Sequence, residues 1–569
     1  MKLLRLITIF LMTICLTGIS FSQELVLPED FPLFTLDRYD DPDPGYLFIF
    51  ARPQTPNKYP GYLEILDNHG TPVFYRHIPY QSGLFKIQPS GLLSFLRMDS
   101  VYNQVYLMDH SFQIIDSVWM EDFELDSHDF IAMENGHFLM IGRELRTIDM
   151  SAVVEGGQTE ATVKGGVIQE LDEDKNVVFE WNSFDHYQIT DSYNDLTRSS
   201  IDFDHPNSLE IDYDGNILLI PRSLNEVTKI DRQTGDIIWR LGGKNNQFEF
   251  ADSSHMFSMP HNFKRMENGH YTVFDNGTER NPAYSRAIEY AIDQENKTIE
   301  MVWEFDADKT VFSRSGGSTK RLSSGNTLVC YGGQVSNPSV TEVKPDGSVA
   351  LTLAFVDPGI RSGSASKHPW KTTLFSTNTD TVDFGEWDGY TYSAYILKIK
   401  NNSGKELELT DHHLHTNAFI IDDNLLPMTL MPNEEKNINL LYYPYDIDSS
   451  VVNDVLTINS DINSDTLIQR VAVQVFLTGT KLYSAVGGYS TDHIRIYPNP
   501  VQDHVSIRSP RLLKGELMIY SMNGSLVYKK DMNDNRVSID FRKFEKGMYL
   551  IEIYDESSNE YHRKKIVKL

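Results

Sequence analysis

Three histidines begin short apolar runs that share one pattern. The runs start at His128, His205 and His261, and each passes through an Asn-Gly or Asp-Gly turn into a second apolar run. Arg222 ends the second run of the middle copy, ILLIPR, where a buried and unpaired charge is costly. Imidazole can act as a nucleophile or as a general acid and base, and guanidinium can hold two oxygens of an oxyanion. These residue types are candidates for a small-molecule site.

A structural role is the alternative for the repeated histidine, because an imidazole can hydrogen-bond one repeat to the next. A fourth copy of the run begins at Ser318 and has no histidine, so the fold does not require one. The surroundings also differ between copies. In the middle copy, Asn207 lies two residues after His205 and Arg222 ends the second run. Both features favour a functional role.

Aromatic residues mark a longer repeat around these runs. Trp119, Trp181, Trp239 and Trp303 each end a strand-like run and follow one another at intervals of about 60 residues. The segments around Tyr75 and Leu353 fit the same position, which gives six copies. Six units of four short strands predict an all-β fold with a six-bladed β-propeller over residues 24–372.

The innermost strand of each propeller blade lines a central channel. If the histidine-headed runs are these strands, the three histidines occupy equivalent places on three blades and converge at one mouth of the channel. Such a mouth is a common place for a small-molecule site. Residues 244–258 precede His261 and are rich in Phe, and they predict either an aromatic wall or lid or a packed loop.

The chain continues into two further β-rich regions. Residues 373–480 show period-two alternation and regular turns, which predict an immunoglobulin-like β-sandwich. Its HHLH stretch contains His412, His413 and His415, which we interpret as a solvated loop because no carboxylate follows at ligand spacing. Residues 481–493 form a Gly/Ser linker.

Residues 494–569 resemble the type A C-terminal sorting domain of the type IX secretion system. The resemblance rests on Tyr-Pro-Asn-Pro at 497–500, the Gly-Met-Tyr-Leu-Ile run at 547–551 and a basic C-terminal end. It implies a small C-terminal β-sandwich, recognition by the secretion machinery, and delivery to the outer surface or medium of a gram-negative bacterium. Residues 1–22 have the basic start, apolar core and small-residue end of a signal peptide, which agrees with export.

Composition excludes several functions. The formal net charge is −29, which disfavours nucleic acid and anionic lipid as partners. No segment after the signal peptide is apolar enough to predict a transmembrane span. Cys330 is the one cysteine outside the signal peptide, so no intramolecular disulfide is expected and we interpret it as buried.

The region around residues 200–280 resembles the bacterial arylsulfate sulfotransferases. The matching segments are HPNS at 205–208, the hairpin Arg222, LNEV and IDRQTGDIIWRLGG up to residue 243, and HNF…FDNG at 261–277. The resemblance implies that His261 is the nucleophile that accepts a sulfuryl group. It also implies that His205, Asn207 and Arg222 hold the sulfuryl oxygens and that His128 is a further active-site imidazole.

The resemblance therefore implies an enzyme that moves a sulfuryl group from a phenolic sulfate to a phenol through a sulfohistidine. No phosphate-binding Gly-rich loop, sulfatase signature or metal-hydrolase constellation is found, so we expect neither nucleotide nor metal cofactor. The alternatives are an aryl sulfate hydrolase and a surface binding protein, for carbohydrate or peptide, with an inactive propeller.

Overall fold

A computed structural model describes most of the chain after the signal peptide. The described residues are 27–53, 61–333, 338–387, 392–421, 426–444, 447, 450–464, 467–481, 494–521, 525–556 and 560–568. The predicted signal peptide and nearly all of the predicted linker lie outside them. None of the described helices is long and apolar enough to cross a membrane.

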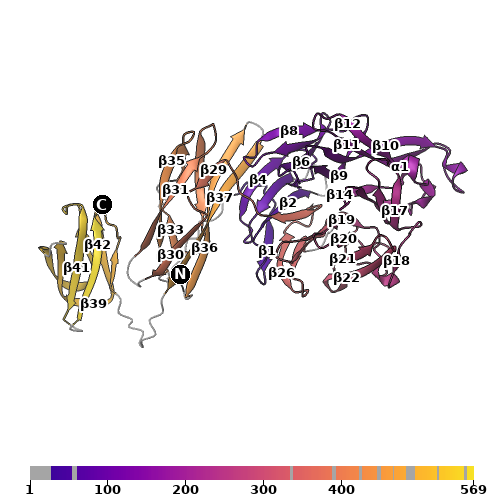
Figure 1. Ribbon diagram of the computed structural model, residues 1–569. Coiled ribbons are helices and arrows are strands. Elements are labelled where there is room, and N and C mark those ends of the chain that lie inside the picture. Colours follow the sequence, from indigo (N-terminus) through magenta and orange to yellow (C-terminus); the bar gives the residue numbers. More distant parts are fainter. Residues whose placement is uncertain are drawn as a thin grey trace, which may run out of the picture. The chain divides into compact units, whose positions relative to one another are not determined.

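Six antiparallel groups of four strands form the blades of a β-propeller (Figure 1). The first blade consists of β5 (Lys86–Ile87), β6 (Leu93–Met98), β7 (Asn103–Met108) and β8 (Ile114–Val118). The second consists of β9 (Glu124–Ala132), β10 (Phe138–Ile148), β11 (Ala161–Leu171) and β12 (Val177–Asn182). The third consists of β14 (Pro206–Ile211), β15 (Ile217–Pro221), β16 (Glu226–Ile230) and β17 (Ile237–Gly242). The next two are β19 (His261–Arg265), β20 (Tyr271–Asp275), β21 (Arg286–Asp293) and β22 (Thr298–Phe305); and β23 (Ser318–Arg321), β24 (Thr327–Cys330), β25 (Val340–Val343) and β26 (Val349–Phe355). The predicted six-bladed fold is confirmed.

The sixth blade joins the two ends of the propeller sequence. Its strands β2 (Tyr46–Pro53), β3 (Gly61–Leu66) and β4 (Pro72–Ile78) come from the start of the chain, and β28 (Ala365–His368) pairs with β2. In the same way, β1 (Phe34–Arg38) extends the fifth blade by pairing with β26. Both pairings close the ring by joining distant segments of the chain.

The hairpin between the first and second strand of a blade requires a glycine. Gly91, Gly136, Gly215, Gly269 and Gly325 occupy this turn in five blades, with φ between +82° and +88°. A side chain at Gly215 or Gly269 would meet open space, so the backbone conformation and not crowding requires glycine there. The first strand lines the cavity, and the turn lets the second strand pair with it in the antiparallel direction.

Apolar side chains fill the space between neighbouring blades. One buried cluster joins Trp181 and Ile168 of the second blade to Leu209 and Leu219 of the third. The predicted aromatic repeat falls at the outermost strands: Trp181, Trp239 and Trp303 lie in fourth strands, and Trp119 directly follows one. Each blade therefore buries both faces, which fixes the inner strands around the channel.

Residues 375–481 form strands β29 to β37. These strands are β29 (Phe375–Thr377), β30 (Thr381–Trp387), β31 (Ser393–Asn401), β32 (Leu407–His413), β33 (Phe419–Ile421), β34 (Met428–Leu430), β35 (Glu435–Tyr442), β36 (Val451–Ser464) and β37 (Leu467–Lys481). One sheet runs β29-β31-β35-β33, and the other runs β37-β36-β32-β34. β37 also pairs with β4, so this second sheet continues the sixth blade, which the sequence did not indicate.

The C-terminal strands form a sheet with its own core. They are β38 (Arg495–Tyr497), β39 (His504–Ser521), β40 (Leu526–Asp540), β41 (Gly547–Asp555) and β42 (Glu560–Lys568). The sheet order is β38-β39-β41-β42, with β40 paired to β39. Ile519 and Ile551 are fully buried in its apolar cluster.

A buried ion pair holds β28 against the fifth blade. Lys367 Nζ lies 2.7 Å from Glu342 Oε2, and both side chains are almost completely buried. Glu342 also accepts hydrogen bonds from Asn326 and from the backbone N–H of Asp43. The pair therefore connects β25, β28 and the segment before β2, where the ring closes.

We expect Lys367→Met to reduce the free energy of unfolding by about 3–5 kcal/mol, because it leaves the Glu342 carboxylate buried without a cation. Denaturant unfolding followed by tryptophan fluorescence measures this. Lys344→Met is the matched control, since its pair with Asp40 is exposed, and it should leave the stability nearly unchanged. Equal losses in the two variants would show that the buried pair does not secure ring closure.

Candidate functional site

The inner strands of all six blades line one large cavity. It has a volume of about 1590 Å³ and is lined by residues of β5, β9, β14, β19, β23 and β28. All five predicted site residues line it, namely His128, His205, Asn207, Arg222 and His261. The structure therefore brings together residues that are far apart in the sequence.

His261 is the first residue of β19 and is held by its side-chain nitrogens. Its Nδ1 lies 2.5 Å from Oδ1 of Asn276. Asn276 uses its Nδ2 to donate to the carbonyls of Ser313 and Gly316, so its Oδ1 is the acceptor and Nδ1 of His261 carries the proton. The lone pair is then on Nε2, which accepts the Gly316 N–H at 3.1 Å. Burial, and then the neighbouring Arg222 and His128, lower the pKa of His261 well below its usual value.

His128 and His205 lie beside His261, and each is held by a carboxylate. The ring centroid of His128 is 4.9 Å from that of His205 and 6.4 Å from that of His261. Nδ1 of His128 lies 2.5 Å from Asp126, and Nδ1 of His205 lies 2.8 Å from Asp202. In this arrangement each carboxylate accepts the Nδ1 proton and leaves Nε2 for chemistry.

Arg143 joins the two carboxylates. Its Nε donates to Asp126, and its NH1 lies 3.1 Å from Asp202. Burial alone would raise the pKa of Asp126, but His128 and Arg143 outweigh burial and lower it. The same guanidinium thus keeps both carboxylates ionised and positions two imidazoles.

The backbone around the site adopts unusual conformations. His205, Met259 and Asn262 have φ of 48°, 51° and 52°, a region that side chains other than glycine rarely occupy. The carbonyl of His205 accepts the N–H of Arg222. Each such residue costs about 1–3 kcal/mol, and strain of this kind is concentrated at functional sites.

Arg222 and Asn207 keep hydrogen-bonding capacity for a ligand. NH2 of Arg222 donates to the Arg314 carbonyl, and its buried Nε has no partner. Nδ2 of Asn207 donates to the carbonyl of Pro260, the residue before His261, and its buried Oδ1 has no partner. Burial and the nearby Arg314 lower the pKa of Arg222.

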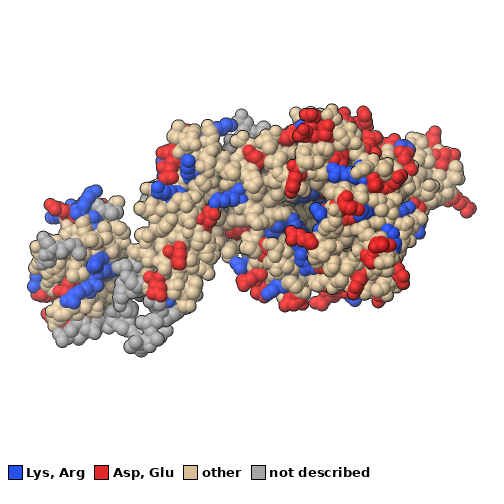
Figure 2. All heavy atoms as spheres, viewed as in Figure 1, with Lys and Arg blue, Asp and Glu red and all other residues tan. Residues whose placement is uncertain are grey.

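The cavity is basic although the protein is acidic. Nine Lys and Arg residues line it against five Asp and Glu residues. Figure 2 shows Lys and Arg around the hollow of the propeller, with Asp and Glu over its outer parts. Among the described residues, the cavity cations with carboxylate partners are Lys86, Lys264, Arg265, Arg321 and Lys367, and those without are Arg52, Arg222, Lys320 and Arg361. An anion that enters therefore meets cations that no carboxylate neutralises.

Two regions of the chain match known families. The Arylsulfotransferase (ASST) family model matches residues 38–354, which is more than half of the chain. The chain belongs to the arylsulfotransferase family. The secretion system C-terminal sorting domain matches residues 495–568, which identifies the protein as one exported to the outer surface.

Other similarities of this chain to known proteins are partial. An endo-acting ulvan lyase of Formosa agariphila is 33% identical over 76 residues, 13% of this chain and 15% of the relative. A funoran endo-beta-hydrolase of Wenyingzhuangia aestuarii is 31% identical over 122 residues, 20% of this chain and 17% of the relative. The chain thus spans under a fifth of either relative. A solved structure of unknown function from Bacteroides caccae is 10% identical, covers 57% of this chain and 99% of its own, and has a TM-score of 0.37.

Four residues around the arylsulfotransferase histidines were not predicted from the sequence. They are Asp126, Arg143, Asp202 and Asn276, and each contacts a predicted residue or its carboxylate. Arg143 ends the run FLMIGR, in the same repeat position as Arg222 in ILLIPR, so the repeat contained a signal for it. Asp129, to which no role was assigned, binds Lys86 and Lys264 and is a buried connection between blades.

The Phe-rich segment 244–258 packs against the propeller core. Phe248, Phe257 and the following Met259 are 4%, 3% and 6% exposed, and none of them lines the cavity. Phe250 packs against the same cluster. The packed-loop alternative is therefore correct, and the aromatic lid is wrong.

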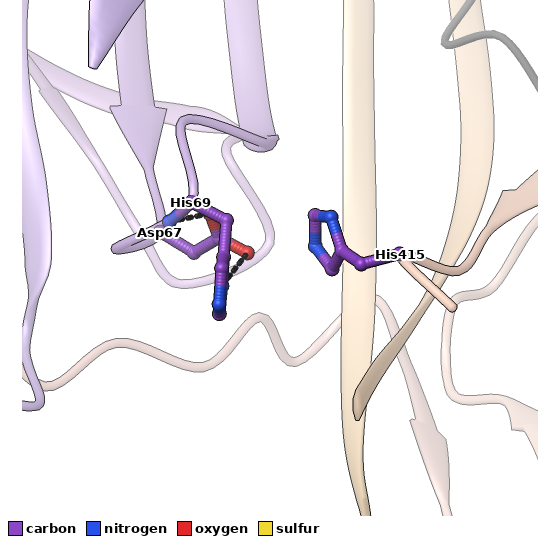
Figure 3. Close-up of side chains that lie close together, drawn as sticks. All are labelled: Asp67, His69 and His415. Atoms are coloured by element: carbon purple, nitrogen blue, oxygen red, sulfur yellow. Dashed lines mark hydrogen bonds and ion pairs between the residues drawn. The ribbon is translucent and has the colours of Figure 1, made fainter. Parts of the chain in front are cut away.

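The predicted solvated HHLH loop is also wrong. His412 and His413 end β32, and His412 is 7% exposed. His415 lies beside His69 and Asp67 of the sixth blade, with 4.5 Å between the two ring centroids (Figure 3). The sequence could not show this, because the carboxylate comes from a distant segment.

Asp67, His69 and His415 have the residue types of a metal site, but other donors occupy their ligand atoms. Asp67 accepts hydrogen bonds from the N–H groups of His69 and Thr71 and from Gln474. The Arg38 guanidinium lies 2.9 Å from Nε2 of His69. Oγ1 of Thr71 lies 3.5 Å from Nε2 of His415 and joins the β3–β4 turn to the segment after β32.

The pKa of buried His261 predicts a pH dependence of stability. In the unfolded chain His261 takes up a proton below about pH 6.5, whereas the folded protein keeps it neutral. The contribution of His261 to the free energy of unfolding is therefore at its full value above pH 6.5. It falls by up to about 1.4 kcal/mol for each pH unit below that. We expect His261→Gln to have a shallower decline between pH 6.5 and 5 in denaturant unfolding. Parallel profiles would contradict a neutral, buried His261.

Proposed function

We propose that this protein transfers a sulfuryl group from a phenolic sulfate ester to a phenol through an N-sulfonated His261. The observation that carries the proposal is the state of His261. Its Nδ1 proton is donated to Asn276 and burial favours the neutral ring. Its Nε2 carries the lone pair, which accepts the Gly316 N–H, and the residue lines the cavity. A neutral imidazole at pH 7 is a competent nucleophile without a separate base.

The transfer has two steps. Nε2 of His261 attacks sulfur, the N–S bond forms, and the ester S–O bond breaks with its electron pair on the departing phenolate. An acceptor phenol then attacks sulfur and the N–S bond breaks, which returns the lone pair to Nε2. The Gly316 N–H bonds to Nε2, so this hydrogen bond must break before the attack. Dividing the reaction makes each step easier than direct transfer.

His128 is the general acid and base in this proposal. It protonates the departing phenolate in the first step and takes the proton of the acceptor phenol in the second. Its ring centroid is 6.4 Å from that of His261, and Asp126 holds its Nδ1, which leaves Nε2 to exchange the proton. Burial lowers the pKa of His205, which favours a neutral ring there and a hydrogen-bonding role.

Arg222 and Asn207 stabilise the transferred group. A sulfuryl group passes through a state with negative charge spread over its oxygens, so fixed donors lower the barrier more than they strengthen ground-state binding. Arg222 offers a planar fork with unused N–H groups, and Asn207 keeps one amide N–H.

The two alternatives differ in what the cavity does. In an aryl sulfate hydrolase, water takes the place of the acceptor phenol. In a binding protein, no bond to His261 forms. The fixed Nδ1 proton and the carboxylate partners of His128 and His205 favour an enzyme, because simple binding does not need oriented imidazoles.

We expect release of para-nitrophenol from para-nitrophenyl sulfate to depend on an added phenol such as 1-naphthol. The full chain is assayed with and without the acceptor, and sulfated naphthol is measured by mass spectrometry. Equal release in both conditions would support hydrolysis, and no release in either would support the binding protein.

We expect Arg222→Ala to reduce kcat by about 10²–10³-fold, because a donor to the transition state is lost. The fold should persist, since the side chain donates only to the Arg314 carbonyl among the described residues. Arg265→Ala is the control, because Arg265 lines the same cavity but pairs with Glu210, and it should keep most activity. Loss of folding in Arg222→Ala would instead indicate a structural cation.

A further inference from the structure

Two arginines face each other on adjacent strands at the wall of the cavity. Arg52 lies in β2 and Arg361 in β27 (Ile360–Arg361), and the two residues are direct register partners of an antiparallel pair. Both line the cavity that holds His261. Like charges directly opposite each other destabilise a sheet, so this pair needs an explanation.

No carboxylate neutralises the two arginines. Among the described residues neither makes a hydrogen bond or an ion pair through its side chain, and Nε of each is buried without a partner. Burial, and then the neighbouring Arg361, lower the pKa of Arg52 to about 10. Buried polar groups in native proteins nearly always have a partner, and an unpaired buried guanidinium is costly.

Arg52 is connected to His261 through a short series of glycine backbone groups. A side chain at Gly363 would lie 3.6 Å from NH2 of Arg52. The Gly363 carbonyl accepts the N–H of Gly317, and the adjacent Gly316 donates its N–H to Nε2 of His261. The backbone of Gly363, Gly317 and Gly316 thus connects the surroundings of the Arg52 guanidinium to the proposed nucleophile.

We propose that Arg52 and Arg361 form a second oxyanion site, which binds a second sulfate or carboxylate group on the aromatic substrate whose sulfuryl group is transferred at His261. The substrate class is then aryl sulfates with a further anionic substituent. The assignment of the first site rests on the proposed function above, whereas the anion site itself rests on the unpaired arginines. Register partners of an antiparallel pair project from the same face of the sheet, so one oxyanion between the two guanidinium groups would offset their mutual repulsion.

Lys320 extends the same basic wall. It lies on β23, its Nζ is 2.9 Å from Nε2 of His368, and it has no carboxylate partner among the described residues. Burial, and then Lys86 and Lys264, lower the pKa of Lys320 to about 8. An anion nearby would favour the charged form of Lys320, so this wall of the cavity could bind more than one negative group.

Arg321 is the matched control. It lines the same cavity, but its NH2 pairs with Glu289 and its guanidinium lies 4.8 Å from the ring centroid of Trp303. Its charge is therefore neutralised within the protein. The variant Arg321→Gln removes one arginine from the cavity but leaves the unpaired Arg52 and Arg361 in place.

Binding of unreactive sulfonates tests the proposal without turnover. The full chain is titrated by calorimetry with benzenesulfonate, with meta- and para-benzenedisulfonate and with meta-sulfobenzoate. We expect at least one dianion to bind about tenfold or more tightly than benzenesulfonate, since a hydrogen-bonded charge contributes about 1.5–3 kcal/mol. The sulfobenzoate arm distinguishes a carboxylate from a second sulfate-like group.

The variants decide which residues hold the second group. Arg52→Gln and Arg361→Gln should each remove most of the dianion preference and keep the affinity for benzenesulfonate, while Arg321→Gln should keep the preference. Equal affinity of wild type for mono- and dianions, or a preference that survives in both variants, overturns the proposal. Acceptor-dependent transfer can fail while the preference remains, which would refute the proposed function and leave the anion site intact.

Thermal stability separates a binding role from a structural one. Without added anion, Arg52→Gln should melt at a higher temperature than wild type, because it removes one of two half-buried like charges that no carboxylate among the described residues neutralises. Adding meta-benzenedisulfonate should raise the melting temperature of wild type more than that of the variant. A lower melting temperature for Arg52→Gln without anion would show that the arginine supports the fold, and would overturn the proposal.

Discussion

The ion bridge from Asp126 through Arg143 to Asp202 is the interaction on which the site depends. One guanidinium joins two carboxylates, and each carboxylate holds Nδ1 of a histidine from a different blade. An imidazole has two nitrogens and free rotation about its side-chain bonds, so it is useful in catalysis only when one nitrogen is fixed. The bridge fixes His128 and His205, and Asn276 does the same for His261 with a neutral amide. The amide places no negative charge beside His261, and burial keeps this nucleophile neutral.

The distribution of charge follows from the same chemistry. An exported protein with a net charge of −29 repels anions at its surface, yet its cavity carries more cations than carboxylates. Most of these cations are paired with acids and brace the inner strands, as Lys86 and Lys264 do at Asp129. The cations that have no carboxylate partner among the described residues line the same cavity as His261, so the cavity attracts an anion that the outer surface repels.

Much of the fold could be predicted from the sequence, because a propeller repeats one hairpin pattern and its aromatic positions. The three histidines, Arg222 and Asn207 could be placed for the same reason, since equivalent repeat positions meet at one axis. Asp126 could also have been predicted as a partner of His128, because it lies two residues before His128 and therefore on the same face of the strand. Asp202 was not, since its contact requires His205 to adopt a positive φ that sequence does not reveal. The β37–β4 pairing and the approach of His415 to His69 join distant segments, for which a single sequence carries no signal.

The central claim is that Nε2 of His261 carries the sulfuryl group between donor and acceptor. The most direct measurement mixes the protein with para-nitrophenyl sulfate in the absence of acceptor, quenches it in alkali within seconds, and maps the modified residue by peptide mass spectrometry. The account predicts one sulfuryl adduct, on the peptide that contains His261, which disappears on adding phenol and is absent from His261→Gln. Acceptor-dependent turnover with no adduct, or with the adduct on another residue, would contradict it.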